Sequence, residues 1–220
     1  MNKSKAIVMS VLVALMSAVI LVTASFALFS DSATVVNYLQ AGTLEIGLAR
    51  TNLTGRTADE NGVLQAVATD TARVDLTEAQ TDDPDDTVFT FGGNSVPGVW
   101  QEATLEIENR GSVAFDYSVA FFYAETPADN SPEQRLAGKL LVTVTDAEGN
   151  VLTDPGTTLA GMVERGALPL GSVSAANETR TFLLKVELPL ESDVLDDGTG
   201  ATIMNADLSF NVTVTATQKV

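Results

Sequence analysis

Residues 208–217 read LSFNVTVTAT, the longest regular alternation of apolar and polar side chains in this chain of 220 residues. A period of two is typical of a β-strand with one buried face. We expect the Leu, Phe, Val and Ala side chains to face a core and the Ser, Asn and Thr side chains to face solvent. Such a strand requires a second layer to cover its apolar face.

Four runs upstream show the same alternation: ATLEIEN (103–109), FDYSVAF (115–121), LLVTVT (140–145) and TFLLKVEL (181–188). The segments RGS (110–112) and AEGN (147–150) are typical of turns. These strands need two facing sheets to bury one face each. The sequence therefore predicts an all-β fold, a jelly-roll-like β-sandwich with short helical insertions, with an immunoglobulin-type sandwich as the alternative.

The helical insertions are expected at residues 132–138 and 157–165. Ser131 as N-cap, Pro132 at the first helical position and Gly138 as C-cap mark the first helix. Residues 51–98 lack a regular pattern, and we expect a long, partly irregular insertion there. Because a structureless loop of that length is uncommon in a compact domain, short strands are predicted within it at 63–67 and 88–91.

The N-terminus has the parts of a secretory signal peptide. Lys3 and Lys5 provide the positive end, and residues 6–29 carry no charge. Ser25 and Ala27 place small side chains where a signal peptidase cleaves. We expect residues 1–27 to be removed and residues 28–220 to form a secreted β-sandwich domain. The alternative is a retained membrane anchor, because roughly 20 apolar residues suffice to span a bilayer.

Charge and composition exclude several function classes. The net charge is −17 at pH 7, and this field repels phosphate backbones, so we expect no nucleic-acid partner. The chain has no histidine and no cysteine. This excludes Ser-His-Asp and Cys-His catalysis and the zinc sites built on histidine. We therefore expect neither an enzyme nor a cofactor.

Acidic residues form two weaker candidate sites. The acidic run at 82–86 offers carboxylates as metal ligands or as an acid pair, but adjacent residues on an exposed loop rarely converge on one atom. Its members are Asp82, Asp83, Asp85 and Asp86. A second Asp-rich turn, with Asp193, Asp196 and Asp197 beside two glycines, is of a kind that binds calcium, although it lacks the spacing of an EF-hand loop.

Several blocks together resemble the TasA/camelysin family of exported surface proteins. They are ALFSD (27–31), LQAGTLEI (39–46), LEIENRGS (105–112) and LSFNVTVTATQ (208–218). The resemblance implies a secreted jelly-roll subunit that self-assembles into biofilm-matrix fibres after a dedicated signal peptidase removes its leader. Other matrix proteins are further expected partners. The alternatives are a monomeric or membrane-anchored surface protein and a metallopeptidase, a label of some members that transfers poorly to a chain without histidine.

Residues 28–41, the expected mature N-terminus, are a candidate donor strand. A sandwich that lacks one strand exposes unpaired backbone groups and an apolar groove, which a segment of a neighbouring copy can fill. The candidate groove-filling side chains are Phe29, Val35, Tyr38 and Leu39. Because donor and acceptor surfaces differ, the contact is head-to-tail and extends into a filament. The alternative is that residues 35–39 form an ordinary edge strand of their own domain.

Overall fold

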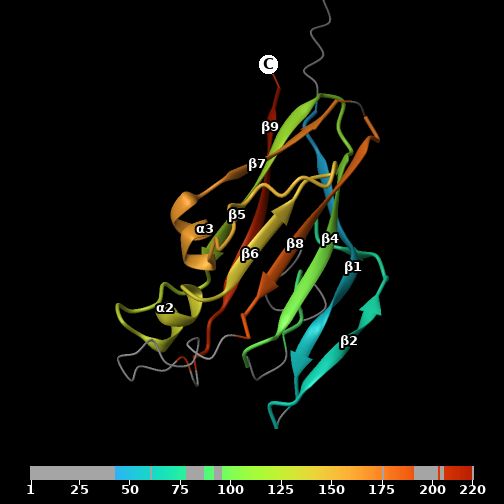
Figure 1. Ribbon diagram of the computed structural model, residues 1–220. Helices are drawn as coiled ribbons and strands as arrows, with labels where there is room; N and C mark the ends of the chain where they lie inside the picture. Colours follow the sequence, from blue (N-terminus) through green and yellow to red (C-terminus); the bar gives the residue numbers. More distant parts are fainter. Residues whose placement is uncertain are drawn as a thin grey trace, which may run out of the picture. The chain divides into compact units, whose positions relative to one another are not determined.

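The computed structural model describes residues 43–59, 61–77, 87–91, 96–174, 176–190, 203 and 206–219. These residues form two antiparallel sheets, a large sheet of order β2-β1-β4-β8-β6, in which β3 also pairs with β1, and a small sheet of order β7-β5-β9 (Figure 1). The strands are β1 (Ile46–Ala58), β2 (Leu64–Asp70), β3 (Val74–Asp75), β4 (Trp100–Asn109), β5 (Phe115–Tyr123), β6 (Leu141–Thr145), β7 (Leu168–Val173), β8 (Thr179–Glu187) and β9 (Phe210–Gln218).

The predicted all-β sandwich with short helical insertions is confirmed. From β4 to β9 the chain passes from one sheet to the other at every step, which gives the sandwich its jelly-roll-like connections. Figure 1 shows β9, in dark red, passing behind the strands of the large sheet. The predicted turn at residues 110–112 is therefore a crossing between the sheets and does not close a hairpin.

The core lies between the sheets and is built from alternate side chains of their strands. Tyr117 of β5 packs against Phe182 of β8, with ring centroids 6.1 Å apart. The fully buried side chains of the central strands include Ala103, Leu105, Ile107, Phe115, Val119, Phe121, Phe182, Leu184 and Val186. The period of two in the sequence is thus the alternation between core and solvent that β4, β5 and β8 display.

Both predicted helices are present, as α2 (Pro132–Ala137) and α3 (Leu159–Arg165). The Ser131 hydroxyl accepts a hydrogen bond from the Gln134 N–H, and Gly138 follows as the C-cap. Thr158 caps α3 in the same way, through the Gly161 N–H. Within the described residues no helix combines the length and the apolar content needed to cross a membrane.

The structure differs from the prediction in residues 51–98. Residues 51–58 continue β1, which pairs with β4 from Ile46 to Arg56 through a register shift between Arg50 and Asn52. At Gly55 a Cβ atom would lie 2.3 Å from the Trp100 carbonyl oxygen, so only glycine lets the two strands approach this closely. The strand predicted at 63–67 exists as β2, which begins at Leu64.

The prediction of a strand at residues 88–91 is wrong. Residues 87–91 are described and belong to no strand. Their backbone is bound by a side chain instead, because the Gln101 amide both accepts from the Thr90 N–H (2.8 Å) and donates to the Thr90 carbonyl oxygen (2.9 Å). Sequence alternation cannot reveal this arrangement, in which a side chain replaces the neighbouring strand.

Candidate assembly interface

The outer edge of β9 is an uncharged strand edge without a partner strand in the described part of the chain. The small sheet has the order β7-β5-β9, so β9 pairs only with β5. Its nine residues read FNVTVTATQ, with no charge and no proline. Charges, prolines and covering segments are the devices that protect edge strands from pairing with other chains. None of these devices lies within the β9 sequence itself.

The opposite ends of both sheets have such protection. In the small sheet, the edge strand β7 contains Pro169, and Gly171 adopts a φ of 148°. In the large sheet, the segment that follows β6 covers that strand, with the Val142 N–H donating to the Thr157 carbonyl and the Leu152 N–H to the Val144 carbonyl. Of the four sheet edges, β7 and β6 are therefore protected, whereas β9 and β2 pair with a described strand on one side only.

The hydrogen-bond register shows which backbone groups line the open edge. The Ala124 N–H donates to the Ser209 carbonyl, and the Lys219 N–H donates to the Ala114 carbonyl, at either end of the β5–β9 ladder. Along an antiparallel ladder, residue pairs that exchange hydrogen bonds alternate with pairs that do not. The backbone groups of the odd-numbered residues of β9 therefore bond to β5. The N–H and C=O groups that point outward therefore belong to Phe210, Val212, Val214 and Ala216, and no hydrogen bond is found between them and another described residue.

The same four residues carry the apolar face of β9, and this face is only half-buried. Phe210, Val212, Val214 and Ala216 are all of intermediate exposure, whereas the inward-facing Phe115, Val119 and Phe121 of the adjacent β5 are fully buried. We predicted a core face here, and the direction of the side chains agrees with that prediction. Their incomplete burial means that the apolar face of β9 is only partly covered.

Residues 87–91 contact the start of this edge. The Phe89 ring lies 6.3 Å from the Phe210 ring and 5.7 Å from the Phe91 ring, measured between centroids. The Phe210 ring in turn lies 6.3 Å from the Phe121 ring. A row of aromatic rings thus connects the segment to the core at β5 through the first residue of β9.

Two inward-facing side chains of the large sheet hold this segment. Arg50 and Gln101 lie opposite Leu105 and Gly55 in the β1–β4 register, so Arg50 shares the core-facing side of the sheet with Leu105. The Arg50 guanidinium donates to the Thr87 carbonyl (2.6 Å) and to the Asp70 carboxylate (3.2 Å). Arg50 and Gln101 are both buried. Their polar atoms therefore depend on these partners for hydrogen bonding.

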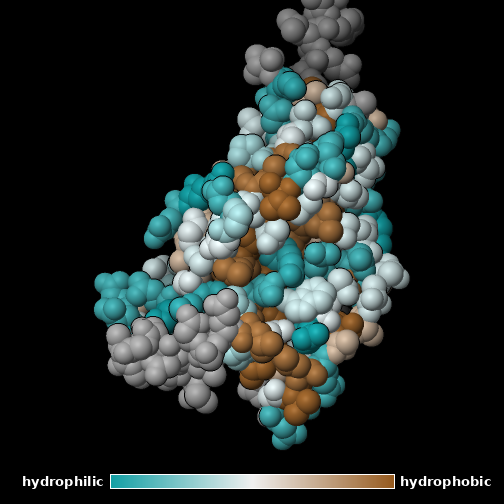
Figure 2. All heavy atoms as spheres, viewed as in Figure 1, coloured by the Kyte–Doolittle hydropathy of each residue, from teal (hydrophilic) through white to brown (hydrophobic). Residues whose placement is uncertain are grey.

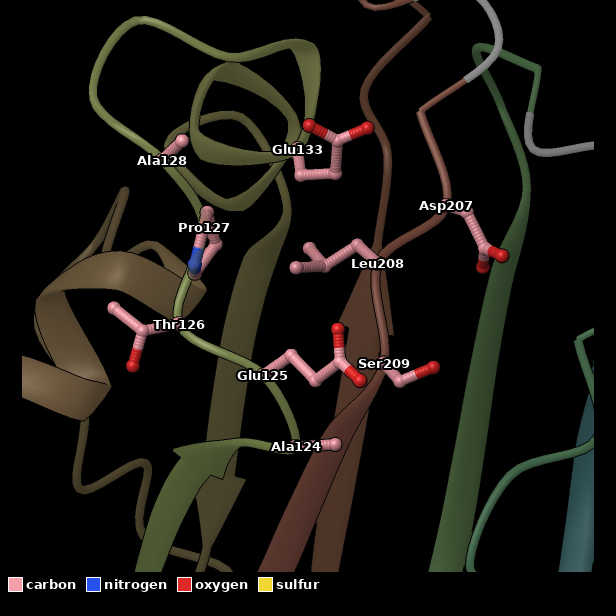
Figure 3. Close-up of a pocket in the computed structure, with 9 residues that line it drawn as sticks. All are labelled: Ala124, Glu125, Thr126, Pro127, Ala128, Glu133, Asp207, Leu208 and Ser209. Atoms are coloured by element: carbon pink, nitrogen blue, oxygen red, sulfur yellow. The ribbon is translucent and has the colours of Figure 1, made fainter.

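A pocket of about 480 Å³ lies beside the start of β9, between residues 124–128, α2 and residues 207–209. Figure 3 shows the carboxylates of Glu133 and Glu125 on its walls, while that of Asp207 points away from both. The pKa of Glu133 is lowered by its own backbone N–H and by the Ser131 hydroxyl, so its charge serves the helix cap. Across the described residues, no three acidic side chains converge as metal ligands.

Apolar residues also gather at the end of the molecule where β1 turns into β2 (Figure 2). Val63 is 57% exposed and Leu190 is 72% exposed. The side chains of Leu190 and Leu64 both lie next to Gly98, so the apolar side chains at this end form a continuous cluster.

All of the site residues predicted from the sequence lie outside the described residues. This holds for the cleavage positions, the donor side chains, the acidic run and the second Asp-rich turn. They are Ser25, Ala27, Phe29, Val35, Tyr38, Leu39, Asp82, Asp83, Asp85, Asp86, Asp193, Asp196 and Asp197. None of these residues can therefore be placed relative to the β9 edge.

Two sequence signals mark the region around the β9 edge. Gln101 lies on the same face of β4 as the buried residues 103, 105 and 107. Its position in the alternation therefore predicts a polar side chain in the core, which needs hydrogen-bond partners. The absence of any charge over nine residues of β9 is the second signal.

A comparison with protein-family models and with curated proteins finds no match to this chain.

Proposed function

We propose that this chain is an exported structural subunit that polymerises into extracellular fibres by strand addition. The observation that carries the proposal is the open edge of β9. It combines outward backbone groups that no described residue pairs with, an apolar face that is incompletely buried and a sequence without charge. An added strand would pair the backbone groups and cover the apolar face at the same time.

The proposed occupant is the N-terminal segment of a second copy. Residues 28–41 contain the apolar side chains Phe29, Val35, Tyr38 and Leu39, and the described sandwich begins at residue 43. The donor would therefore extend directly from a folded domain whose own β9 accepts the next copy. This head-to-tail geometry does not close on itself and favours a filament. The resemblance to the TasA/camelysin family supports the same function.

In this proposal, assembly begins only after the protein has been exported and its leader has been cleaved. While the leader is attached, the donor segment is joined to an uncharged run that includes residues 6–27. Cleavage after Ala27 would free the new N-terminus outside the cell, where further copies and other matrix proteins are its partners. We propose a structural role in preference to catalysis, because the chain lacks histidine and cysteine.

The substitution Val214→Pro tests the proposal at one backbone group. The Val214 N–H points to the open edge, so proline removes an outward donor and leaves the ladder to β5 intact. Val214→Ala is the matched control, because it loses packing but keeps the N–H. Both processed proteins are examined by electron microscopy and sedimentation.

We expect fibres from the wild type and from Val214→Ala, and folded monomers from Val214→Pro. Circular dichroism checks that the proline variant keeps its sheets. Wild-type protein that stays monomeric at high concentration across pH and ionic strength would overturn the proposed function. Normal fibres from a folded Val214→Pro variant would rule out the β9 edge as the acceptor.

A further inference from the structure

Residues 87–91 lie between the inner face of the large sheet and the start of β9, on which a further strand of the small sheet would begin to pair. On one side, Arg50 of β1 and Gln101 of β4 hold the segment from the inner face of the large sheet. On the other side, Phe89 contacts Phe210 at the start of β9. The small sheet contributes no described strand beyond β9, so the segment covers core that would otherwise be open there.

The segment fills this space without pairing the edge. No hydrogen bond connects the backbone of residues 87–91 with the outward groups of β9 within the described structure. Side chains supply its backbone bonds instead, with Gln101 binding Thr90 and Arg50 binding Thr87. The described residues therefore leave the outward groups of Val212 and Val214 without a partner, and a strand that lies in the same place could pair with them.

A true strand would make both sets of contacts in that position. It would form ladder bonds with β9 and place alternate side chains over Phe210 and the core. The Gln101 amide binds backbone groups only, so it could bind any extended segment in place of residue 90. If such a strand replaced residues 87–91, hydrogen bonds to β9 would be gained. The hydrogen bonds of the Gln101 amide would be kept, because the new strand would also offer backbone groups to it.

We propose that residues 87–91 are a placeholder, which the N-terminal segment of a second copy displaces during assembly. The acceptor groove then consists of the β9 edge, Phe210, Gln101 and Arg50, and it selects an extended strand with an aromatic side chain in place of Phe89. Phe29 and Tyr38 provide such side chains in the donor segment. This inference rests on the proposed function. It adds that residues 87–91 compete with the donor segment and cover the acceptor groove in the free monomer.

Hydrogen exchange of processed protein, before and after assembly, tests the displacement. We expect exchange at the Thr90 amide to become about tenfold faster or more in fibres, as the loss of one hydrogen bond brings about. Exchange at Val212 and Val214 becomes slower by a similar factor as the ladder forms. Fibres in which Thr90 stays protected would overturn the placeholder while leaving the proposed function standing. Absence of wild-type fibres would overturn the proposed function itself.

Assembly kinetics give a second, independent test with a matched pair of variants. Phe89→Ala removes the ring that packs against Phe210 and so weakens the placeholder, whereas Phe122→Ala removes an exposed ring on the other face of β5. Gln101 is left unchanged in both variants, because its amide would also bind the incoming strand. We expect a shorter lag in light scattering for Phe89→Ala and no shortening for Phe122→Ala. An equal or longer lag in the folded Phe89 variant would contradict the inference.

Discussion

Gln101 and Asn109 stand near the two ends of β4, both fully buried, and each binds the backbone of another segment with both atoms of its side-chain amide. Gln101 pairs with the N–H and the C=O of Thr90. Asn109 donates to the Val113 carbonyl (2.9 Å) and accepts from the Gly111 N–H (3.0 Å). One strand thus fixes both the crossing to β5 and the segment beside β9.

Removal of either amide is expected to destabilise the fold to a similar extent. Gln101→Ala and Asn109→Ala each leave backbone groups unpaired, at a cost of about 1–3 kcal/mol in the free energy of unfolding. Urea unfolding of each monomer measures this change. Gln65→Ala is the control, because Gln65 is exposed and donates only to Asp59, so its effect stays below about 0.5 kcal/mol. Equal midpoints for all three variants would show that the buried amides are not essential.

A pair of phenylalanines tests where the core lies. Phe182 is fully buried between the sheets, and Phe122 is 48% exposed on the other face of β5. Phe182→Ala should cost about 3–5 kcal/mol, since it leaves a cavity against Tyr117. Phe122→Ala should cost less than about 1 kcal/mol. Thermal unfolding followed by circular dichroism separates the two, and a reversed order would contradict the described sandwich.

The central strands could be predicted from the sequence because their alternation directly reflects burial. The alternation in ATLEIEN and FDYSVAF became β4 and β5, with Leu105, Ile107, Phe115 and Phe121 fully buried. The caps at Ser131 and Thr158 likewise depend on neighbours three residues away. Such local signals are present in any reading of the sequence.

The candidate site could not be predicted because its contacts are tertiary. Thr90 is bound by the side chain of Gln101, eleven residues away, and no periodicity encodes a backbone held in that way. The half-burial of Val212 and Val214 depends on how many strands the small sheet has. The alternation in β9 gave the direction of its side chains correctly, but it could not show that no described strand lies beyond β9 in the small sheet.

Acid should weaken the fold through carboxylates that accept backbone hydrogen bonds. The pKa of Asp59 is lowered chiefly by the Val63 N–H, and the pKa of Asp146 chiefly by the Asn150 side chain. A lowered folded pKa gives stability that is complete above the unfolded value of about 3.9 and is lost as the pH falls through the folded pKa. We expect a constant urea midpoint from pH 7 to about 5 and a decline below about pH 4.

Substitution at Asp146 isolates one contribution to this decline. In Asp146→Asn the side chain no longer titrates, so the midpoint should start lower at neutral pH and fall less steeply in acid. Asp154→Asn is the control, because no hydrogen bond to its carboxylate is found in the described structure. Coincident acid profiles for Asp146→Asn and the wild type would contradict the assignment.

Retention of the leader should prevent assembly. Ala27→Leu places a large side chain where the signal peptidase requires a small one, so we expect the intact mass of the exported chain to include residues 1–27. Wild-type protein should have the mass of residues 28–220. The uncleaved variant should give no fibres by electron microscopy. A wild-type mass that includes the leader would favour the membrane-anchored alternative.

Two defective subunits that complement each other provide the strictest test of a head-to-tail contact. A chain that begins at Leu39 lacks most of the donor but keeps the compact unit Gly42–Val220, and it can only accept. Val214→Pro keeps the donor and can only donate. Each should be monomeric alone, and each should cap growing wild-type fibres at substoichiometric amounts. Mixed with one another, they should form a one-to-one heterodimer that grows no further, because the single donor and the single acceptor are then used. Fibres from the chain that begins at Leu39, or higher oligomers in the mixture, would rule out residues 28–38 as the donor.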